Sequence, residues 1–366
     1  MIVVAAIALG LWLTLLLVPW QPWRCRERLE ATDTPSTRDD FTVLIPARNE
    51  ADVIADTLNA LALAAPQASV IVIDDESSDA TASKVRDSVH PHVRLLVGSA
   101  PPPDWTGKLW ALEQGLRETT TPRVLLLDAD IALAPGMIAA LERQADNGYE
   151  LVSVLAAPCF DGMWAHWLLP AFVYFFKLIY PFALVNHARS RLAAAAGGVV
   201  LVEREALARA GAFGAWRDEL IDDCTLAARL KTTGARCWLG LTHGAHSQRR
   251  QGLGSIIVMV ARTAYVQLGE SPLMLLAASA LMLLAFIAPL AALAAPGPAR
   301  WLGLAAWAAL ALSYLPTLLY YGLNPLQSVF LPVTAFAYLA MSWHSALRAW
   351  FGTRSIWKGR HYTSPP

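Results

Sequence analysis

The sequence predicts an α/β domain with a mostly parallel sheet, attached to one N-terminal and about three C-terminal transmembrane helices. Strand-like and helix-like segments alternate between residues 41 and 157, residues 1–20 carry no charge, and three long apolar stretches occupy roughly 272–295, 301–321 and 325–347. Alternation of this kind is typical of a parallel sheet with helices on both faces. Apolar stretches of about 20 residues are long enough to span a bilayer.

The composition supports a chain that is partly globular and partly membrane-embedded. Of 366 residues, 55% are hydrophobic and 16% are charged, which is too apolar for an ordinary soluble domain and too charged for a pure bundle of membrane helices. Lysine plus arginine equals aspartate plus glutamate, at 29 each, so the charge balance gives no reason to expect a nucleic-acid partner. The cysteines (Cys25, Cys159, Cys224 and Cys237) lack metal-site spacing and favour a reducing compartment over a disulfide framework.

The first apolar run predicts a transmembrane helix at residues 1–22. A signal peptide is the alternative, but no basic segment precedes the run and no small-residue cleavage site follows it. The basic stretch WRCRER (23–28) comes next, which predicts that the following domain is cytoplasmic. The basic tail at 348–366 also favours that side, whereas three further spans within 272–347 would leave it outside. Either one C-terminal segment is re-entrant, or the tail is an exception to the rule that basic segments lie on the cytoplasmic side.

Five apolar runs predict the strands of the domain, at 41–46, 69–74, 92–98, 123–130 and 150–157. The segments between them have helical spacing, with apolar residues on one face, and one of them (134–145) has a proline in its first turn, as helices favour. Ligands of such sheets bind at the carboxyl ends of the strands. Asp74, Asp75, Asp128 and Asp130 all fall at these ends.

Asp128 and Asp130 follow an apolar run in LLLDADI (125–131). In an extended strand both carboxylates would point to the same side, and two like charges held together do not stabilise a fold. Mg²⁺ and Mn²⁺ take one or two carboxylates and fill their other positions with water and phosphate oxygens. The pair therefore predicts a divalent-cation site for a diphosphate substrate, with an ordinary turn as the alternative.

Three further acidic or basic positions are candidates for the same site. Asp74 or Asp75 could accept hydrogen bonds from a nucleotide base or ribose, or form an Asx-turn that caps the next helix. Lys108 sits at a predicted helix start, where a lysine is unfavourable unless an anion is bound; a solvated lysine is the alternative. Asp222 and Asp223 open an amphipathic helix and could supply a general base or simply favourable N-terminal charge.

Two apolar segments are predicted to lie at the membrane surface. Residues 163–185 are long enough to cross a bilayer, yet they lie between Asp130 and Asp223 in the chain. One crossing would separate those carboxylates, so we expect the segment to lie on the membrane or to dip in and return. Its aromatic residues, two prolines, histidine and lysine suit an interface; a buried helical pair is the alternative. Residues 252–268 form the second such surface.

The ordered set VLIPARNE, VIDDESSDAT, LLLDADI, AAAAGGVVLVEREAL and LIDDCTLAARL resembles the family 2 glycosyltransferases, which have the GT-A fold. The resemblance covers most of 40–265, and it places a GT-A domain at 40–250. The stretches PPPDWTGKLWA and LLPAFVYFFKLIYPF resemble the hopanoid-associated membrane glycosyltransferases within that family.

The resemblance implies an inverting enzyme in a bacterial-type inner (plasma) membrane. It would use Mn²⁺ or Mg²⁺ to move one sugar from a nucleotide-diphosphate sugar of the UDP type to a hopanoid or other polyisoprenoid lipid. Asp130, with Asp128, would bind the metal, and Asp223 would be the catalytic base, with Asp222 in place of the family's glutamate. The implied nucleotide-sugar site is Pro46, Arg48, Glu50, Asp74, Asp75, Lys108, Asp128 and Arg262.

One family motif is missing from the sequence. Processive relatives carry Gln-x-x-Arg-Trp after the base, and this chain has no such string. Arg262 could take the place of that arginine, with Arg249 and Arg250 as other candidates. The missing motif disfavours a polysaccharide synthase, and the retained carboxylates disfavour a catalytically dead lipid-binding scaffold. His243 and His246 are predicted to be surface loop residues, with a metal or phosphate contact as the alternative.

Overall fold

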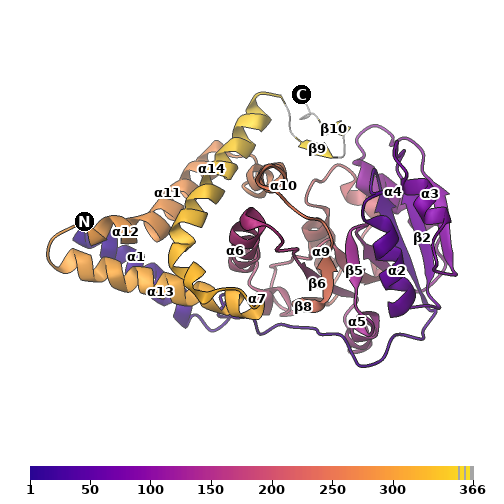
Figure 1. Cartoon of the computed structure of the whole chain (residues 1–366), viewed down its shortest axis with the longest axis horizontal. Coiled ribbons are helices and arrows are strands. Elements are labelled where there is room, and N and C mark those ends of the chain that lie inside the picture. The colour runs from indigo at the N-terminus through magenta and orange to yellow at the C-terminus, as the bar shows by residue number, and fades with distance from the viewer. Residues whose placement is uncertain (353–354, 358–359, 363–366) are drawn as a thin grey trace.

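An eight-stranded sheet forms the centre of the domain that follows the first helix (Figure 1). The computed structural model describes residues 1–352, 355–357 and 360–362. Strands lie in the order β3-β2-β1-β4-β7-β6-β8-β5. Their bounds are β1 Phe41–Ala47, β2 Ser69–Asp74, β3 Val93–Val97, β4 Arg123–Leu127, β5 Ile131–Leu133, β6 Leu151–Ala157, β7 Val199–Glu203 and β8 Cys237–Ser247.

The predicted α/β fold with a mostly parallel sheet is confirmed. β1 pairs in parallel with β2 and β4, β2 with β3, and β6 with β8. β7 is inserted antiparallel between β4 and β6, and β5 is antiparallel to β8. The sequence did not predict β7 or β8, because neither follows the strand–helix alternation on which the prediction rested. Because β1, β2 and β4 are parallel neighbours, their carboxyl ends meet at one edge of the sheet.

Helices cover both faces of this sheet. α2, α3 and α5 pack on the face that holds Val43 and Ile45 of β1, and α4, α8 and α9 pack on the face that holds Leu44. A strand buried on both sides needs a continuous apolar run, which explains the sequence of β1. The bounds are α2 Ile54–Ala64, α3 Thr81–Arg86, α4 Gly107–Arg117, α5 Met137–Asp146, α8 Arg204–Arg209, η1 Phe213–Trp216 and α9 Asp222–Thr232.

A glycine lets α4 approach the sheet closely. A Cβ atom on Gly115 would lie 2.7 Å from Cδ1 of Ile73 and 3.1 Å from Cδ2 of Leu44. We therefore expect Gly115→Val to destabilise the fold by about 1–3 kcal/mol through overpacking, measured as a lower midpoint of thermal unfolding. Gly10→Val is the control, because a Cβ at Gly10 has no atom within 4 Å. Equal midpoints for the two variants would contradict this packing.

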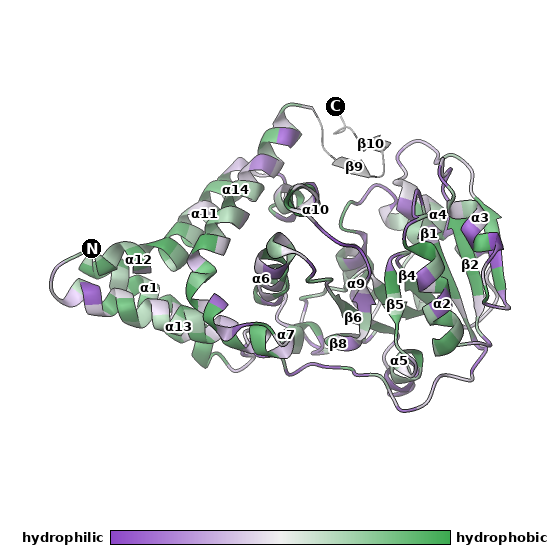
Figure 2. Ribbon diagram, in the orientation of Figure 1, coloured by the Kyte–Doolittle hydropathy of each residue, from purple (hydrophilic) through white to green (hydrophobic). Residues whose placement is uncertain are grey.

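The remaining helices gather on one side of the molecule and are mostly apolar, as the green ribbons of Figure 2 show. Three of them, at 272–293, 298–320 and 325–350, are long and apolar enough to cross a membrane by length and composition. The bounds are α1 Ile2–Leu17, α6 Met163–Ile179, α7 Phe182–Val185, α10 Leu253–Gln267, α11 Pro272–Met282, η2 Leu283–Ile287, α12 Ala288–Leu293, α13 Pro298–Tyr320, η3 Pro325–Phe330, α14 Leu331–Trp350, and strands β9 Ser355–Trp357 and β10 Arg360–Tyr362.

The three C-terminal spans agree with the predicted membrane segments. The N-terminal helix has 16 residues, which is shorter than the predicted span of 1–22 and short of the length of the other three. The basic tail predicted at 348–366 falls partly outside the described residues. The predicted cytoplasmic orientation of the domain and its boundaries stay predictions.

The helices α6 and α10 lie between the membrane-side helices and the sheet (Figure 1). Polar contacts join α6 to the membrane spans: Tyr174 and Ser313 share a hydrogen bond of 2.6 Å, and the buried Lys177 donates to Thr317 over 3.1 Å. At its other end α6 exposes Met163 and Trp164. One face of α6 is therefore a packed core and another is open, so its placement at a membrane surface stays a prediction.

Candidate active site

Asp128 and Asp130 lie in a turn at the carboxyl edge of the sheet. The predicted strand 123–130 is wrong in its last three residues, because β4 ends at Leu127. Thr57 fixes the turn by donating its hydroxyl hydrogen to the carbonyl of Ala129 over 2.8 Å. The alternation of a strand therefore does not apply here, and the two carboxylates contact different partners.

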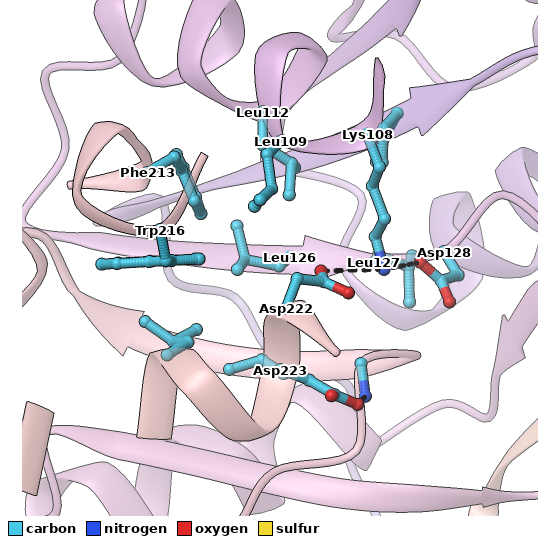
Figure 3. Close-up of a pocket in the computed structure, with 14 residues that line it drawn as sticks. Lys108, Leu109, Leu112, Leu126, Leu127, Asp128, Phe213, Trp216, Asp222 and Asp223 are labelled. Atoms are coloured by element: carbon cyan, nitrogen blue, oxygen red, sulfur yellow. Dashed lines mark hydrogen bonds and ion pairs between the residues drawn. The ribbon is translucent and has the colours of Figure 1, made fainter. Parts of the chain in front are cut away.

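Lys108 joins the Asp128 carboxylate to the acidic pair of α9 (Figure 3). Its Nζ lies 3.0 Å from Oδ1 of Asp128 and 3.4 Å from Oδ2 of Asp222. Burial alone would lower the pKa of Lys108, but Asp128, Asp222 and Asp223 outweigh burial and hold that pKa above its ordinary value. The lysine is thus a fixed cation, and the acidic pairs on either side of 163–185 lie within reach of one ammonium group.

Asp223 is partly buried in the first turn of α9. Its Oδ2 accepts a hydrogen bond of 2.7 Å from the backbone N–H of Gly197, and its Oδ1 accepts one of 2.7 Å from that of Cys224. Burial, and then repulsion from Asp222, raise the pKa of Asp223 from 3.8 to about 6, although Lys108 opposes the rise. A carboxylate with this pKa can take a proton near neutral pH.

Gly197 leaves the space that Asp223 needs. A Cβ atom at Gly197 would lie 3.1 Å from Oδ2 of Asp223 and 3.4 Å from Nζ of Lys108. The AAAAGG stretch that contains this glycine was singled out in the sequence, and its close approach to the carboxylate gives a physical reason for a glycine there.

Asp130 points to a second group of charged side chains. Its Oδ2 accepts a hydrogen bond of 2.6 Å from the Ser247 hydroxyl and lies 3.6 Å from Nε of Arg249. Arg249 also donates from Nη2 to Oε2 of Glu50 over 2.6 Å. Arg249 therefore connects the predicted metal ligand to the end of the VLIPARNE motif.

These side chains surround a cavity of about 410 Å³. Five carboxylates face three cationic side chains in its lining, so the cavity has a surplus of negative charge. The lining residues are Pro46, Glu50, Thr106, Lys108, Asp128, Ala129, Asp130, Glu219, Leu220, Asp222, Arg249, Gln251, Ser255, Val258, Met259 and Arg262.

Among the three arginine candidates, Arg262 differs from the others because one of its hydrogen-bond donors has no partner. Its Nε is buried and, within the described residues, has no hydrogen-bond partner. Arg249 already holds Glu50 and Asp130, while Arg250 pairs with Asp161 over 3.2 Å and its side chain is 82% exposed. Arg262 is therefore the arginine whose hydrogen-bonding capacity remains open toward a ligand.

The carboxylates of Asp128 and Asp130 fit a divalent cation such as Mg²⁺ or Mn²⁺. Oxygen donors are what these ions prefer, and two protein ligands suffice when water and phosphate oxygens complete the shell. Burial raises the pKa of Asp128 above its ordinary value, Lys108 opposes this, and Asp130 adds to it. Within the described residues no group of three or more His, Cys, Asp and Glu forms a metal cluster, so a cation here would depend on ligands from outside the chain.

Four predicted site residues do not line this cavity: Arg48, Asp74, Asp75 and Asp223. The Oδ1 of Asp74 accepts a hydrogen bond of 3.2 Å from the N–H of Ser77, three residues further along the chain, so this carboxylate has a local contact with the loop that follows β2. Arg48 Nη1 donates to the backbone carbonyl of Asp75 and lies 3.9 Å from that residue's carboxylate. Asp74 and Asp75 are buried, so their binding to a nucleotide stays a prediction.

The histidines are on a strand, and their prediction as loop residues is wrong. His243 and His246 both belong to β8. The ring of His243 contacts Oε1 of Glu30 at 3.1 Å and the carbonyl of Tyr320 at 2.9 Å. This histidine joins the sheet to the end of a membrane-side helix.

The sequence reasoning missed four polar residues of the cavity wall, namely Thr106, Glu219, Gln251 and Ser255. Glu219 lies three residues before the acidic pair of α9, and Gln251 ends the QRRQ stretch (248–251). The side-chain oxygen of Gln251 is buried and has no hydrogen-bond partner within the described residues. Position next to a motif was the signal for Glu219 and Gln251, but single polar residues in loops are too common for that signal to be used.

Residues 38–249 match the protein family described as "Glycosyltransferase like family 2". Two similar curated proteins are the 4,4'-diaponeurosporenoate glycosyltransferases of two strains of Staphylococcus aureus, which are 34% identical to this chain over 106 residues. This stretch is 29% of the chain and 28% of those enzymes, so the match spans less than a third of the length of these relatives.

A solved structure is similar over almost the whole chain. It is a mannosyltransferase from Pyrobaculum calidifontis in complex with GDP-Man and Mn2+, and the similarity covers 95% of this chain and 99% of that one, with a TM-score of 0.58 and 22% identity. At this level of identity the similarity is one of fold. It agrees with the family match and with the predicted GT-A fold.

Proposed function

The chain belongs to glycosyltransferase family 2, and on this basis we propose that it is a membrane-bound, metal-dependent glycosyltransferase. In this proposal it moves one sugar from a nucleotide-diphosphate sugar, most simply a UDP-sugar, to a membrane lipid of the hopanoid or another polyisoprenoid class. The observation that carries the proposal is the charged cavity between the Asp128–Asp130 turn and α9. One wall of that cavity is α10, a helix that packs against the membrane spans through Ile256 and Val260.

The donor's diphosphate would bind where the cationic side chains converge. Lys108 and Arg262 both line the cavity, and the open Nε of Arg262 suits a phosphate oxygen. Asp130 and Asp128 would hold Mn²⁺ or Mg²⁺. When bound, the cation would stabilise the negative charge that develops on the leaving diphosphate. Pro46 also lines the cavity, and Arg48, Asp74 and Asp75 lie beyond it on the side where we propose the nucleoside.

Asp223 is the proposed general base. Two backbone N–H groups hold its carboxylate, so its orientation does not depend on a flexible partner. It would take the proton from the acceptor hydroxyl as that oxygen attacks the sugar, and inversion follows from a single displacement. Asp222 raises the basicity of Asp223 by repulsion and contacts Lys108.

The lipid acceptor is proposed from the position of α6 and α10 between the spans and the sheet (Figure 1). The relative that is 34% identical over 106 residues is named for a carotenoid acid, which supports an apolar acceptor here. The basic stretch that follows α1 supports a cytoplasmic domain on an inner membrane of bacterial type.

The experiment that tests the function uses the full chain in phosphatidylcholine vesicles that contain a total lipid extract of the producing cells. A panel of radiolabelled UDP- and GDP-sugars is supplied with Mn²⁺ or with a chelator, and radioactivity in the lipid fraction is counted. We expect transfer from one donor with Mn²⁺ and none with the chelator. Nucleotide binding without transfer or donor hydrolysis would instead favour the scaffold alternative, and absence of any nucleotide binding would refute the enzyme.

We expect the transfer rate to rise with pH through about 6. Asp223 must be ionised to accept a proton, and its pKa of about 6 places the midpoint there, so kcat/KM at pH 5 should be about tenfold below its plateau. Asp222→Asn removes the repulsion that raises this pKa, so it should move the midpoint to lower pH. A midpoint that stays in place in Asp222→Asn would contradict the assignment.

Removing the open guanidinium should weaken donor binding. We expect Arg262→Ala to raise the dissociation constant of the donor about 10- to 100-fold, because a charge-assisted hydrogen bond to phosphate is lost. Arg250→Ala is the matched control, since that arginine is exposed and pairs with Asp161. Calorimetric titration with the nucleoside diphosphate and Mn²⁺ measures both. Equal affinities in the two variants would remove Arg262 from the site.

A further inference from the structure

A second cavity, of about 510 Å³, lies on the far side of the segment that carries the acidic pair. Its walls include α9, Tyr180, which directly follows α6, and the end of α10. The lining residues are Tyr180, Ala193, Glu219, Ile221, Cys224, Thr225, Ala228, Arg229, Thr232, Val266 and Gln267. None of the residues to which the proposed donor site assigns a role lines this cavity.

The second cavity is next to the proposed base and to the donor cavity. Glu219 lines both cavities, and Ile221 and Cys224 stand on either side of the Asp222–Asp223 pair in the chain. In an inverting displacement the acceptor oxygen attacks the anomeric carbon on the face opposite the leaving diphosphate, with the base beside that oxygen. Asp223 itself lines neither cavity, but its neighbours do: Asp222 lines the donor cavity, and Cys224 lines the second one.

The walls of this cavity are held in place without a ligand. Lys231 of α9 donates to the carbonyls of Leu192, at 2.7 Å, and Ser190, at 3.3 Å, which fixes the segment that leads to Ala193. The hydroxyl of Tyr180 donates to Oε1 of Gln267 over 2.9 Å, which ties the residue that follows α6 to the last residue of α10. A site that is formed before binding loses less free energy to ordering of its walls.

The charges of the lining indicate which head group fits. Glu219 is the one carboxylate and Arg229 the one guanidinium in the lining, and Arg229 also donates to the carbonyl of Ala215 over 3.2 Å. A phosphate head would need a surplus of cationic donors, and the lining of this cavity has none, because Glu219 balances Arg229. Hydroxyls and amides such as Thr225 and Gln267 suit a neutral polyol.

We propose that this cavity binds the acceptor, and that the acceptor is a lipid with an uncharged, hydroxyl-bearing head. The proposal rests on the proposed function. The apolar part of the lipid leaves past Val266 of α10 and the exposed Ile179 of α6. The head's O–H gives its proton to Asp223 while the oxygen bonds to the anomeric carbon. The bond from that carbon to the diphosphate breaks, and the nucleotide leaves with the electron pair.

The test uses photolabelling of the full chain in phosphatidylcholine vesicles. One vesicle set contains a monoacylglycerol with a diazirine in its acyl chain, and the other contains the same molecule phosphorylated on its head. Cross-linked peptides are identified by mass spectrometry. Ala228→Trp and Thr232→Trp place an indole in the cavity from exposed positions of α9, and Ala208→Trp, at an exposed position of α8 outside the lining, is the control.

We expect the monoacylglycerol to label peptides that contain residues 219–232 and the end of α10. Each cavity variant should lower that labelling about tenfold, Ala208→Trp should not, and nucleotide binding with Mn²⁺ should stay unchanged in all three. Label confined to the membrane spans, label that is insensitive to both cavity variants, or equal label from the phosphorylated probe would overturn the proposal. If the wild-type protein binds no nucleotide but is still labelled in this cavity, the proposed glycosyltransferase function is refuted and the lipid-binding site is retained.

Discussion

Asp223→Asn should leave donor binding intact and lower sugar transfer about 100- to 10,000-fold, the range in which a positioned general base acts. The amide cannot take the proton of the acceptor hydroxyl. Asp223 accepts hydrogen bonds from the N–H groups of Gly197 and Cys224 and does not line the donor cavity, so the lining of that cavity is unchanged in the variant. Transfer is measured as radiolabel in the lipid fraction, and donor affinity by calorimetry with Mn²⁺.

The Asp223→Asn substitution also lowers the stability of the fold locally, and the controls must separate this effect from the loss of the general base. Both carboxylate oxygens of Asp223 accept hydrogen bonds from backbone N–H groups. In the asparagine variant the side-chain NH₂ group would point at one of these N–H groups, and that hydrogen bond would be lost. Thermal unfolding of the variant measures that loss of stability. Asp218→Asn, at an exposed position shortly before α9, controls for loss of negative charge. Turnover at the wild-type rate in Asp223→Asn would remove this residue from the base role.

Asp130→Asn should abolish the metal-dependent part of donor binding, which we expect to weaken the affinity about 100-fold. An amide oxygen is a poorer ligand for a hard divalent cation than a carboxylate. Ser247 and Arg249 hold the Asp130 side chain, so asparagine can keep the same position and the change is mainly one of charge.

Titration with and without the metal makes this prediction specific. In Mn²⁺ the wild type should bind the nucleoside diphosphate far more tightly than Asp130→Asn, and in a chelator the two should become equal. Asp161→Asn, a surface change beside Arg250, should behave like the wild type in both. A variant that retained the Mn²⁺ enhancement would place the cation elsewhere in the cavity.

The α/β fold could be predicted from the sequence because the patterns that indicate it lie within short segments of the chain. Five apolar runs and the helical spacing between them follow from side-chain periodicity, and the three C-terminal spans follow from length and apolarity. The carboxyl ends of β1, β2 and β4 then had to meet at one edge, so the candidate residues that follow these strands were placed near one another. The strands β7 and β8 were missed, because both come after the regular strand–helix alternation of residues 41–157 has ended.

For the site, the sequence could predict which residue types take part but not which side chains contact one another. Asp128, Asp130 and the pair on α9 were recognised by sequence, but their partners were not. The end of β4 at Leu127 sends Asp128 toward Lys108 and Asp130 toward Ser247 and Arg249, and a strand continued to residue 130 would not have done so.

The sequence by itself determined which elements form and which side chains carry charge, since periodicity, apolar length and residue type are properties of neighbours along the chain. Only the tertiary structure decided that one lysine contacts both acidic pairs, that Arg262 keeps an open donor, and that Tyr180, α9 and the end of α10 line a second cavity. Each of these depends on segments that are far apart in sequence, and their distances are set by packing against a common sheet and membrane-side core.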